Sequence, residues 1–366
     1  MTMTTSPLAA ALAGADHTDD DLGVEVAAAY GDVEAEYRAL RSGAGLVDRS
    51  ARVAVRVTGA DAIGYLDSLL SQSVAALADG GGAHTLLLTP QGKLDTDLRM
   101  LRIGDDLRLD AEVGRGEALV ASLLRFRIRV KVDVTDETGG WGTITVRGPD
   151  AAGLVARVAE VDVPEHPHAH VGWGARRVVQ ADWPGSPGVD VVGPVADLAD
   201  AWDALVEAGA VPAGLTAVEA VRVESGIPRQ GLDIDERTIP QEAFLDRDAV
   251  SFTKGCFLGQ ELVCRIDTRG RVNRYLRGIE GLLDPSARLA VGAEVLTDGG
   301  DSGDSSGVNG GKAVGTVTSV AASPVRGVVA LAMVRREVEP PAPVFLASPS
   351  GGDRVRATVV ELPRSA

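Results

Sequence analysis

Cysteine, aromatic residues and positive charge are all scarce in this chain of 366 residues. Its two cysteines, Cys256 and Cys264, are too few for a disulfide framework or a four-cysteine zinc site, so we expect a reducing, cytoplasmic location. Aromatic residues make up 4% of the sequence, so the hydrophobic cores must be built mainly from Val, Leu and Ala. The formal net charge of -16 repels phosphate groups, which argues against a nucleic-acid partner.

No stretch has the layout of a membrane span or a secretion signal. The apolar run 8–14 follows no basic residue and precedes several aspartates, whereas a signal peptide carries its positive charge first. No apolar run approaches the ~18 residues that a membrane helix needs. We therefore expect no membrane partner. The polar, Ala-rich and acidic segment 1–25 is predicted to be disordered.

Common catalytic sequence patterns are also missing. The chain holds no GxxxxGK[ST] phosphate loop, and neither an HExxH nor a Ser/His/Asp pattern is legible. His166, His168 and His170 occupy alternate positions, and a trio of this kind could meet a metal ion. They lie in a Pro-rich stretch, however, which favours a loop, so we predict no metal site here.

Short predicted strands and helices alternate over residues 26–277. The stretches 97–103 and 107–113 are typical of two strands joined by a tight hairpin turn. Such hairpins favour an antiparallel α+β fold, here in two subdomains, over a parallel sheet. Residues 278–366 change to Gly-rich strand segments and predict a small β-barrel. The insertion 298–311 is rich in Gly, Ser and Asp, and we predict a disordered loop.

Basic residues occupy alternate positions of the predicted strand 125–134. Side chains two positions apart lie on the same face of a strand, so this row of cations shares one face. The row consists of Arg125, Arg127, Arg129 and Lys131. It is either a solvated strand face or an electropositive wall for an anionic ligand.

The chain concentrates its unusual chemistry in the eight residues 254–261, KGCFLGQE. A thiol among cations is more readily a thiolate than one in apolar surroundings, and Lys254 and Arg265 are the candidates for keeping Cys256 anionic. The alternative is that Cys256 is a small buried side chain, as free cysteines often are. The other residues that we expect to support the thiol are Gly255, Gly259, Gln260, Glu261 and Arg269.

This stretch also carries a family resemblance. Residues 239–274 closely resemble the signature region of YgfZ-type folate-binding proteins, which belong with the T-protein of the glycine cleavage system (GcvT). Residues 36–72 and 314–336 resemble the opening and the carboxy-terminal barrel of the same proteins. The resemblance implies a GcvT/YgfZ-like α+β fold, with antiparallel sheets and helices around a central channel, and tetrahydrofolate as the cofactor.

The resemblance implies roles for individual residues. Asp190 matches a carboxylate that binds the amino group and ring N–H of the pterin, and two carboxylate oxygens suit two adjacent donors. Trp183 matches an aromatic residue, and Arg222 matches an arginine that could meet the carboxylates of folate. The row that contains Arg125 and Arg127 would attract the glutamate tail. The alternatives are a turn position for Asp190 and a salt bridge at a helix end for Arg222.

One position departs from the T-protein pattern. T-proteins have two adjacent aspartates, one of which handles the aminomethyl transfer, whereas this chain has Thr96 followed by Asp97. The transfer machinery therefore looks incomplete, which favours the YgfZ branch. In that branch Cys256 is the reactive thiol, and nothing in the motif requires Cys264, which we expect to be structural.

We therefore predict a tetrahydrofolate-binding protein that supports assembly or repair of iron–sulfur clusters in client enzymes, as the resemblance implies. The alternative is a folate-dependent aminomethyltransferase that uses Asp97. A folate reservoir without catalysis is a third possibility. The expected partners are folate and iron–sulfur client or assembly proteins. The candidate catalytic residues are Cys256, Lys254 and Asp97.

Overall fold

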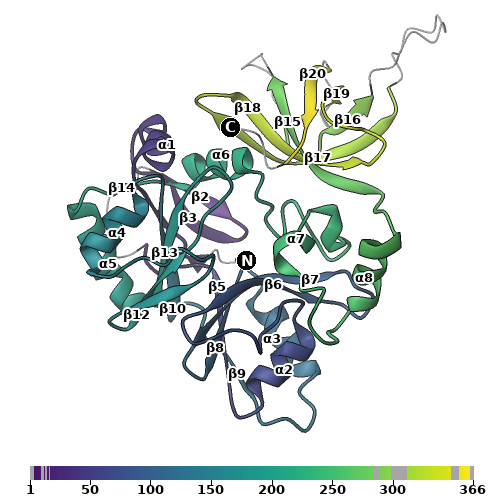
Figure 1. Cartoon of the computed structure of the whole chain (residues 1–366). Coiled ribbons are helices and arrows are strands. Elements are labelled where there is room, and N and C mark those ends of the chain that lie inside the picture. The colour runs from purple at the N-terminus through teal and green to yellow at the C-terminus, as the bar shows by residue number, and fades with distance from the viewer. Residues whose placement is uncertain are drawn as a thin grey trace, which may run out of the picture.

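The computed structural model describes residues 4–9, 12, 15, 17–282, 289–297, 311–347 and 354–362. Except for Gly311, the predicted disordered loop 298–311 lies outside these residues. The described chain forms three open sheets and a closed barrel, with one α+β lobe to the left of the barrel and one below it in Figure 1. The predicted α+β class with antiparallel sheets is therefore confirmed.

The first sheet has the strand order β6-β7-β8-β5-β9 and lies in the lower lobe of Figure 1. All of its pairings are antiparallel. Helices α2 (Ala62–Leu69) and α3 (Gly116–Arg125) share one apolar core with the sheet, made mainly of Val, Leu and Ala. The five strands are β5 (Val53–Thr58), β6 (Gly82–Leu88), β7 (Leu94–Ile103), β8 (Asp106–Ala111) and β9 (Asp133–Asp136).

The second sheet has the order β11-β12-β13-β10-β4-β14. Helices α4 (Ala151–Ala159) and α5 (Val195–Glu207) share its main apolar core, whereas α1 (Val33–Ser42) and α6 (Leu215–Ser225) pack together in a separate cluster. The side chain of Asp32 caps α1 by accepting a hydrogen bond from the Glu34 N–H. The six strands are β4 (Gly45–Asp48), β10 (Trp141–Arg147), β11 (His170–Trp173), β12 (Arg176–Gln180), β13 (Gly188–Pro194) and β14 (Val211–Pro212).

The described part of segment 1–25 is ordered, so the prediction of a disordered segment is wrong. Strands β1 (Thr4–Thr5), β2 (His17–Asp21) and β3 (Val24–Ala29) form a small sheet in the order β1-β3-β2. Leu8 is 1% exposed and belongs to the core of the second sheet. The composition was misleading because this segment is held by contacts with residues far along the chain.

The carboxy-terminal part forms the predicted barrel, closed in the order β15-β18-β17-β16-β19-β20. The short helices η1 (Pro240–Glu242) and α7 (Asp246–Ala249) and the helix α8 (Gln260–Arg269) lead into it. Apolar side chains from all six strands form one core. The strands are β15 (Arg274–Leu282), β16 (Glu294–Thr297), β17 (Ala313–Ser323), β18 (Gly327–Arg335), β19 (Ala342–Ala347) and β20 (Val355–Val360).

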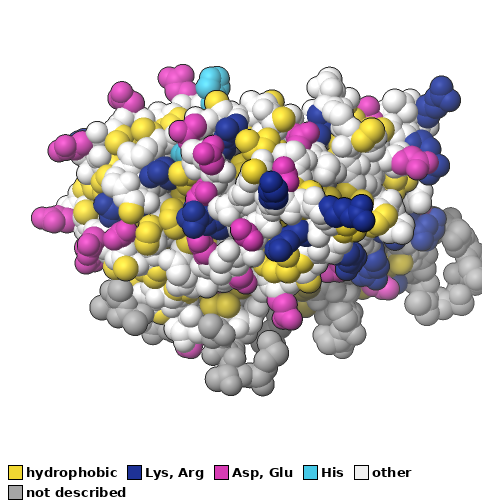
Figure 2. Space-filling view, turned by 90° about the horizontal axis from the view of Figure 1, so that it is seen from below, with side chains coloured by type: hydrophobic (Ala, Val, Ile, Leu, Met, Phe, Trp, Pro, Cys, Tyr) yellow, Lys and Arg dark blue, Asp and Glu magenta, His cyan; other side chains and the backbone are white. Residues whose placement is uncertain are grey.

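The predicted strand 125–134, with its row of basic residues, is wrong. Helix α3 runs to Arg125, irregular chain follows, and β9 begins only at Asp133. Arg129 has φ of 56°, a left-handed conformation that no strand contains. The four cations Arg125, Arg127, Arg129 and Lys131 are exposed. Figure 2 shows one face of the molecule, on which both basic and acidic side chains are present.

Candidate functional site

A cavity of about 950 Å³ lies where the three open sheets meet the segment 226–248 and the barrel. Its size is at the upper end of the range for small-molecule sites, about 300–1,000 Å³. Of the predicted site residues, those that line it are Asp97, Trp183, Asp190 and Arg222. Arg125, Arg127 and the motif 254–261 do not line it.

Strand pairing places a row of charged residues on the cavity face of the first sheet. His84 on β6 is paired with Arg99 on β7, and Arg99 is paired with Asp110 on β8. Paired residues share a face of the sheet, and Asp97, two positions before Arg99, lies on that face too. All four residues line the cavity.

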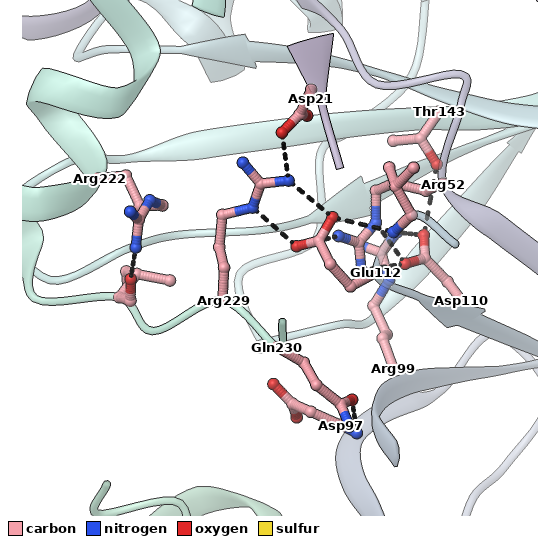
Figure 3. A network of polar contacts seen from close by, with 12 residues as sticks. Asp21, Arg52, Asp97, Arg99, Asp110, Glu112, Thr143, Arg222, Arg229 and Gln230 are labelled. Atoms are coloured by element: carbon pink, nitrogen blue, oxygen red, sulfur yellow. Dashed lines mark hydrogen bonds and ion pairs between the residues drawn. The ribbon is translucent and has the colours of Figure 1, made fainter. Parts of the chain in front are cut away.

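Arginines and carboxylates alternate along this wall (Figure 3). Arg99 donates to Asp190 across 2.6 Å and to Asp110 across 2.9 Å. Arg52 also pairs with Asp110, with 2.5 Å between nitrogen and oxygen. Burial alone would raise the pKa of Asp110, but Arg52 and Arg99 outweigh it and lower that pKa to about 2. The wall is therefore ionised at neutral pH.

Arg229 extends the network toward the amino-terminal sheet. It donates to Glu112 across 2.9 Å and pairs with Asp21 across 2.8 Å. Figure 3 shows its guanidinium between these two carboxylates. Burial opposes ionisation of Glu112, but Arg229 and Arg52 outweigh it and hold the Glu112 pKa well below its usual range.

Asp190 is 2% exposed and lies within β13, so it is not a turn residue. Its pairing partner on β10, Thr145, donates a hydrogen bond of 2.6 Å to Oδ1, and Arg99 binds Oδ2. Burial would raise the Asp190 pKa, but Arg99 and Arg49 outweigh it and lower that pKa. Each oxygen of an ionised carboxylate accepts more than one hydrogen bond, so Asp190 can also accept from a ligand.

Trp183 forms part of the cavity wall, with one of its ring faces covered by an arginine. The guanidinium carbon of Arg147 lies 3.7 Å from the ring centroid. Arg147 is fixed by hydrogen bonds to the carbonyls of Ser186, at 2.8 Å, and Ala181, at 3.0 Å. Burial lowers the pKa of Arg147 to about 9. The aromatic plane expected from the sequence is present.

Arg222 lines the cavity but has no donor left for a ligand. It is 2% exposed, and all five of its N–H groups serve protein acceptors. These acceptors are Glu219 (twice), Asp233, Ile227 O and Ser319 Oγ. Its predicted contact with folate carboxylates is therefore corrected: Arg222 joins α6 to the segment 227–233 and to β17. The alternative of a salt bridge at a helix end is closer to the geometry.

Asp97 faces the cavity, whereas Thr96 does not. Thr96 is 1% exposed, and its hydroxyl donates to Asp95. The Asp97 carboxylate lies 2.5 Å from His84 Nε2, and its backbone N–H donates to the side chain of Gln230 across 2.9 Å (Figure 3). Successive strand residues point to opposite faces, so threonine at position 96 removes nothing from the cavity. The inference that this change impairs the site is therefore wrong.

Arg49 is a cavity residue that sequence reasoning missed. Its side chain makes no hydrogen bond or ion pair with any residue that the structure describes, although it lines the cavity together with Asp190. Burial, reinforced by Arg52, lowers its pKa to about 10. The resemblance to folate-binding proteins gave no reason to select this position. An unpaired cation in a cavity is suited to receive an acceptor group of a ligand.

The motif 254–261 docks on the end of α2 instead of entering the cavity. The Lys254 ammonium donates to the carbonyls of Asp67, Leu70 and Gln72, at 2.6, 2.9 and 3.0 Å. Burial lowers its pKa against the opposing charge of Asp67. Lys254 therefore anchors the loop, which corrects its predicted roles as a catalytic residue and as the cation beside Cys256.

Cys256 itself is exposed, so the alternative of a small buried side chain is wrong. Phe257, the next residue, is buried, and the Leu258 N–H donates to Ser68 O across 3.1 Å. Phe257 and Leu258 therefore attach the loop to the protein, while the thiol of Cys256 is exposed to solvent.

The second cysteine, Cys264, has a pKa that is raised by burial and, to a smaller extent, by the nearby Asp267. Its structural role stays a prediction.

Other motif residues shape the loop and α8. The Gln260 side chain accepts the Phe257 N–H across 3.1 Å. Gly259 adopts a left-handed φ of 77° at the start of α8. The remaining motif and flanking residues are exposed: Gly255, Glu261, Arg265 and Arg269. The residues of the motif therefore fix the conformation of the loop, and Cys256 is exposed on it.

Comparison with known proteins agrees with this architecture. Residues 11–254 match the model of the GCVT N-terminal domain. An aminomethyltransferase from Rubrobacter xylanophilus is 30% identical over 292 residues, covering 76% of this chain and 78% of that protein. The crystal structure of glycine cleavage system aminomethyltransferase T from Bartonella henselae has the same fold, with a TM-score of 0.84, 23% identity and coverage of 99% of this chain and 98% of that one.

Within the described part of the chain, no helix is long and apolar enough to cross a membrane. The family match covers well over half of the chain, including both of the larger open sheets and the cavity residues Asp97 and Asp190. On this match, and on the similarity to the Rubrobacter protein, the chain belongs to the GCVT N-terminal domain family.

Proposed function

We propose that this chain binds tetrahydrofolate in the cavity and acts as a folate-dependent one-carbon transferase of the aminomethyltransferase kind. The observation that carries the proposal is that one cavity brings together Asp97, Trp183 and Asp190, three positions selected for folate chemistry. The family membership supports this alternative better than a role with iron–sulfur clusters.

The donor and acceptor groups of the cavity fit a reduced folate. Asp190 supplies an ionised acceptor for the amino group and ring N–H of the pterin, and Trp183 supplies an apolar plane beside it. Arg49 supplies a donor that no described residue uses. Tetrahydrofolate would provide the amine nitrogens that carry the one-carbon unit, and Asp97 is the wall carboxylate available for acid–base chemistry there.

Binding and transfer test the proposal separately. Calorimetry should show that full-length protein binds tetrahydrofolate and that Asp190→Asn weakens binding by more than about tenfold, because a charged acceptor is lost. Asp105→Asn, in the exposed hairpin turn, is the matched control. Unchanged affinity in Asp190→Asn would remove this residue from the site.

The transfer reaction is measured with an aminomethylated lipoyl carrier protein and tetrahydrofolate. We expect methylenetetrahydrofolate to form, and Asp97→Asn to slow its formation by about a hundredfold with little change in folate affinity. If the wild-type chain binds folate but forms no product, the transferase proposal fails.

A second candidate is the iron–sulfur role of the YgfZ-type proteins, in the cytoplasm that the cysteine content suggests. The observation that favours it is the exposed Cys256 on an anchored loop outside the cavity lining. A strain without this gene should lose activity of enzymes with labile clusters, and a Cys256→Ser copy should not restore it. Full restoration by that copy would reject a role for the thiol and favour a folate reservoir or the transferase.

A further inference from the structure

A histidine–carboxylate pair in the cavity wall is left unexplained by pterin recognition. His84 Nε2 lies 2.5 Å from Asp97 Oδ1, and the two side chains are 27% and 20% exposed. The other ring nitrogen of His84, Nδ1, makes no hydrogen bond with any described residue. One nitrogen is thus fixed by protein, while the other has no partner among the described residues, and His84 lines the cavity.

The surroundings of His84 favour its charged form. Burial opposes the charge, and Arg52 from the neighbouring wall does so as well, but Asp97 and Asp248 outweigh them and raise the His84 pKa. Asp97 comes from β7, and Asp248 lies in α7 and also lines the cavity. The raised pKa favours the protonated imidazole, which can act as a proton donor.

A second imidazole faces this pair from the stretch that contains the three alternating histidines. The ring centroids of His84 and His168 lie 6.5 Å apart. Burial, reinforced by Arg99 and His84, lowers the pKa of His168 to about 3, so this ring is neutral. Of the two rings, His84 is the one that carries a mobile proton.

His168 is held there at a conformational cost. Its φ is 61°, and its buried Nδ1 has no hydrogen-bond partner among the described residues. A Cβ at Gly82 would lie 2.5 Å from the His168 carbonyl oxygen, so glycine permits the loop to pack on β6. Strained backbone and unpaired buried polar atoms concentrate at functional sites.

We propose that His84 is a catalytic proton donor of this site, fixed by Asp97 and faced by the ring of His168. The proposal rests on the transfer function proposed above. When the bond between the one-carbon unit and its carrier atom breaks, the electron pair stays on the carrier atom, which takes the proton from His84 Nδ1. The one-carbon unit forms its new bond to an amine nitrogen of the folate. The proton that this nitrogen loses returns to His84 through water, so the step is neither an oxidation nor a reduction.

The first test follows the histidine rings by NMR in the full-length protein labelled with 15N-histidine. Without ligand, the His84 ring should titrate above its ordinary value of about 6.5. Saturating tetrahydrofolate should shift the His84 and His168 ring signals and leave those of His166, which is outside the cavity lining, unchanged. If tetrahydrofolate binds without moving the His84 signals, the ring does not face the ligand and the inference is overturned.

The second test compares pH–rate profiles. Wild-type transfer should decline as the pH rises through the raised His84 pKa, because the proton donor is lost. In His84→Gln the amide can still donate a hydrogen bond to Asp97, but it cannot transfer a proton. The transfer rate should therefore fall about a hundredfold, and the rate should no longer decrease as the pH rises. Its folate affinity should stay within about threefold of wild type, and His166→Gln should match wild type throughout.

The outcomes separate the two proposals. If the wild-type protein binds no tetrahydrofolate or forms no product, both the proposed function and the role of His84 are rejected. If wild type is active but His84→Gln keeps both its rate and its pH profile, only the role of His84 is rejected. An equal loss of folate affinity and rate in His84→Gln would also reject it, since that pattern marks a binding residue.

Discussion

Gly92 and Gly259 lie in backbone contact, which brings the turn after β6 against the first residues of α8. A Cβ built on Gly259 would lie 3.1 Å from Gly92 Cα and 2.4 Å from Thr89 O, and one built on Gly92 would lie 2.8 Å from Gly259 O. Both residues have left-handed φ values, 72° and 77°. This contact explains why the motif needs its second glycine, and it connects the cysteine loop to the strand hairpin that carries Asp97.

Replacing Gly259 by alanine should therefore destabilise the fold. We expect a loss of about 2–4 kcal/mol in the free energy of unfolding, from the left-handed backbone and from overlap with Thr89 O. Urea denaturation measures it. The control is Gly255→Ala, where an added Cβ meets nothing within 4 Å, and its effect should stay within about 0.5 kcal/mol. Equal midpoints for the two variants would refute the packing argument.

Lys254→Met should destabilise the protein without weakening folate binding. The substitution leaves three backbone carbonyls without their charged donor, which costs about 2–4 kcal/mol. Lys93→Met, at an exposed position, is the control for loss of one charge. Unfolding and calorimetry together check the prediction. A stable Lys254→Met protein with impaired function would instead return Lys254 to the list of catalytic candidates.

Arg49→Met should weaken folate binding with little effect on the free energy of unfolding. Because Arg49 has no partner among the described residues, its removal should change the free energy of unfolding by less than about 1 kcal/mol. If it binds the folate, affinity should drop about tenfold or more. Arg99→Met is the contrasting variant, since it leaves Asp190 and Asp110 without a shared cation and should destabilise by about 3 kcal/mol or more. Unchanged folate affinity in Arg49→Met would exclude Arg49 from the site.

Glu112→Gln should have an effect that depends on pH. The folded-state pKa of Glu112 is lowered, so its stabilising contribution is present above the unfolded-state pKa of about 4.3 and is lost as the pH falls through the folded value. The variant should lose about 3 kcal/mol at pH 7, and the difference from wild type should shrink below about pH 4. Glu117→Gln, on the exposed side of α3, should show neither effect. Denaturant titrations between pH 7 and pH 3 measure the free energy of unfolding of both proteins. If their difference does not change with pH, the ionised Glu112 is not the stabilising group.

Leu8→Ala tests whether the amino-terminal segment is part of the fold. A side chain that is 1% exposed and packed in the core of the second sheet should cost about 2–4 kcal/mol when truncated. Val325→Ala, at a valine that is 78% exposed, should change the unfolding free energy by less than about 0.5 kcal/mol. Thermal and urea unfolding give both values. A neutral Leu8→Ala would restore the original expectation of a disordered segment.

Local patterns predicted much of this fold. The alternation and hairpin turn around residues 97–113 correctly indicated antiparallel strands, and the Gly-rich strand segments after residue 278 correctly indicated a barrel. The same approach failed at residues 125–131, because basic residues at alternate positions also fit exposed irregular chain after a helix. Alternation identifies a strand only where one face is buried.

The sequence by itself determined the fold class. It also selected Asp97, Trp183 and Asp190, because each lies in a short segment that resembles the family pattern. Only the tertiary structure decided how the charged side chains are used. Arg222 and Lys254 are bound to protein acceptors, whereas Arg49 and His84 line the cavity and keep nitrogen atoms without a partner among the described residues. The physical reason is that a buried ionic group takes its role from partners far away in the sequence, and those partners are set by how sheets and loops pack.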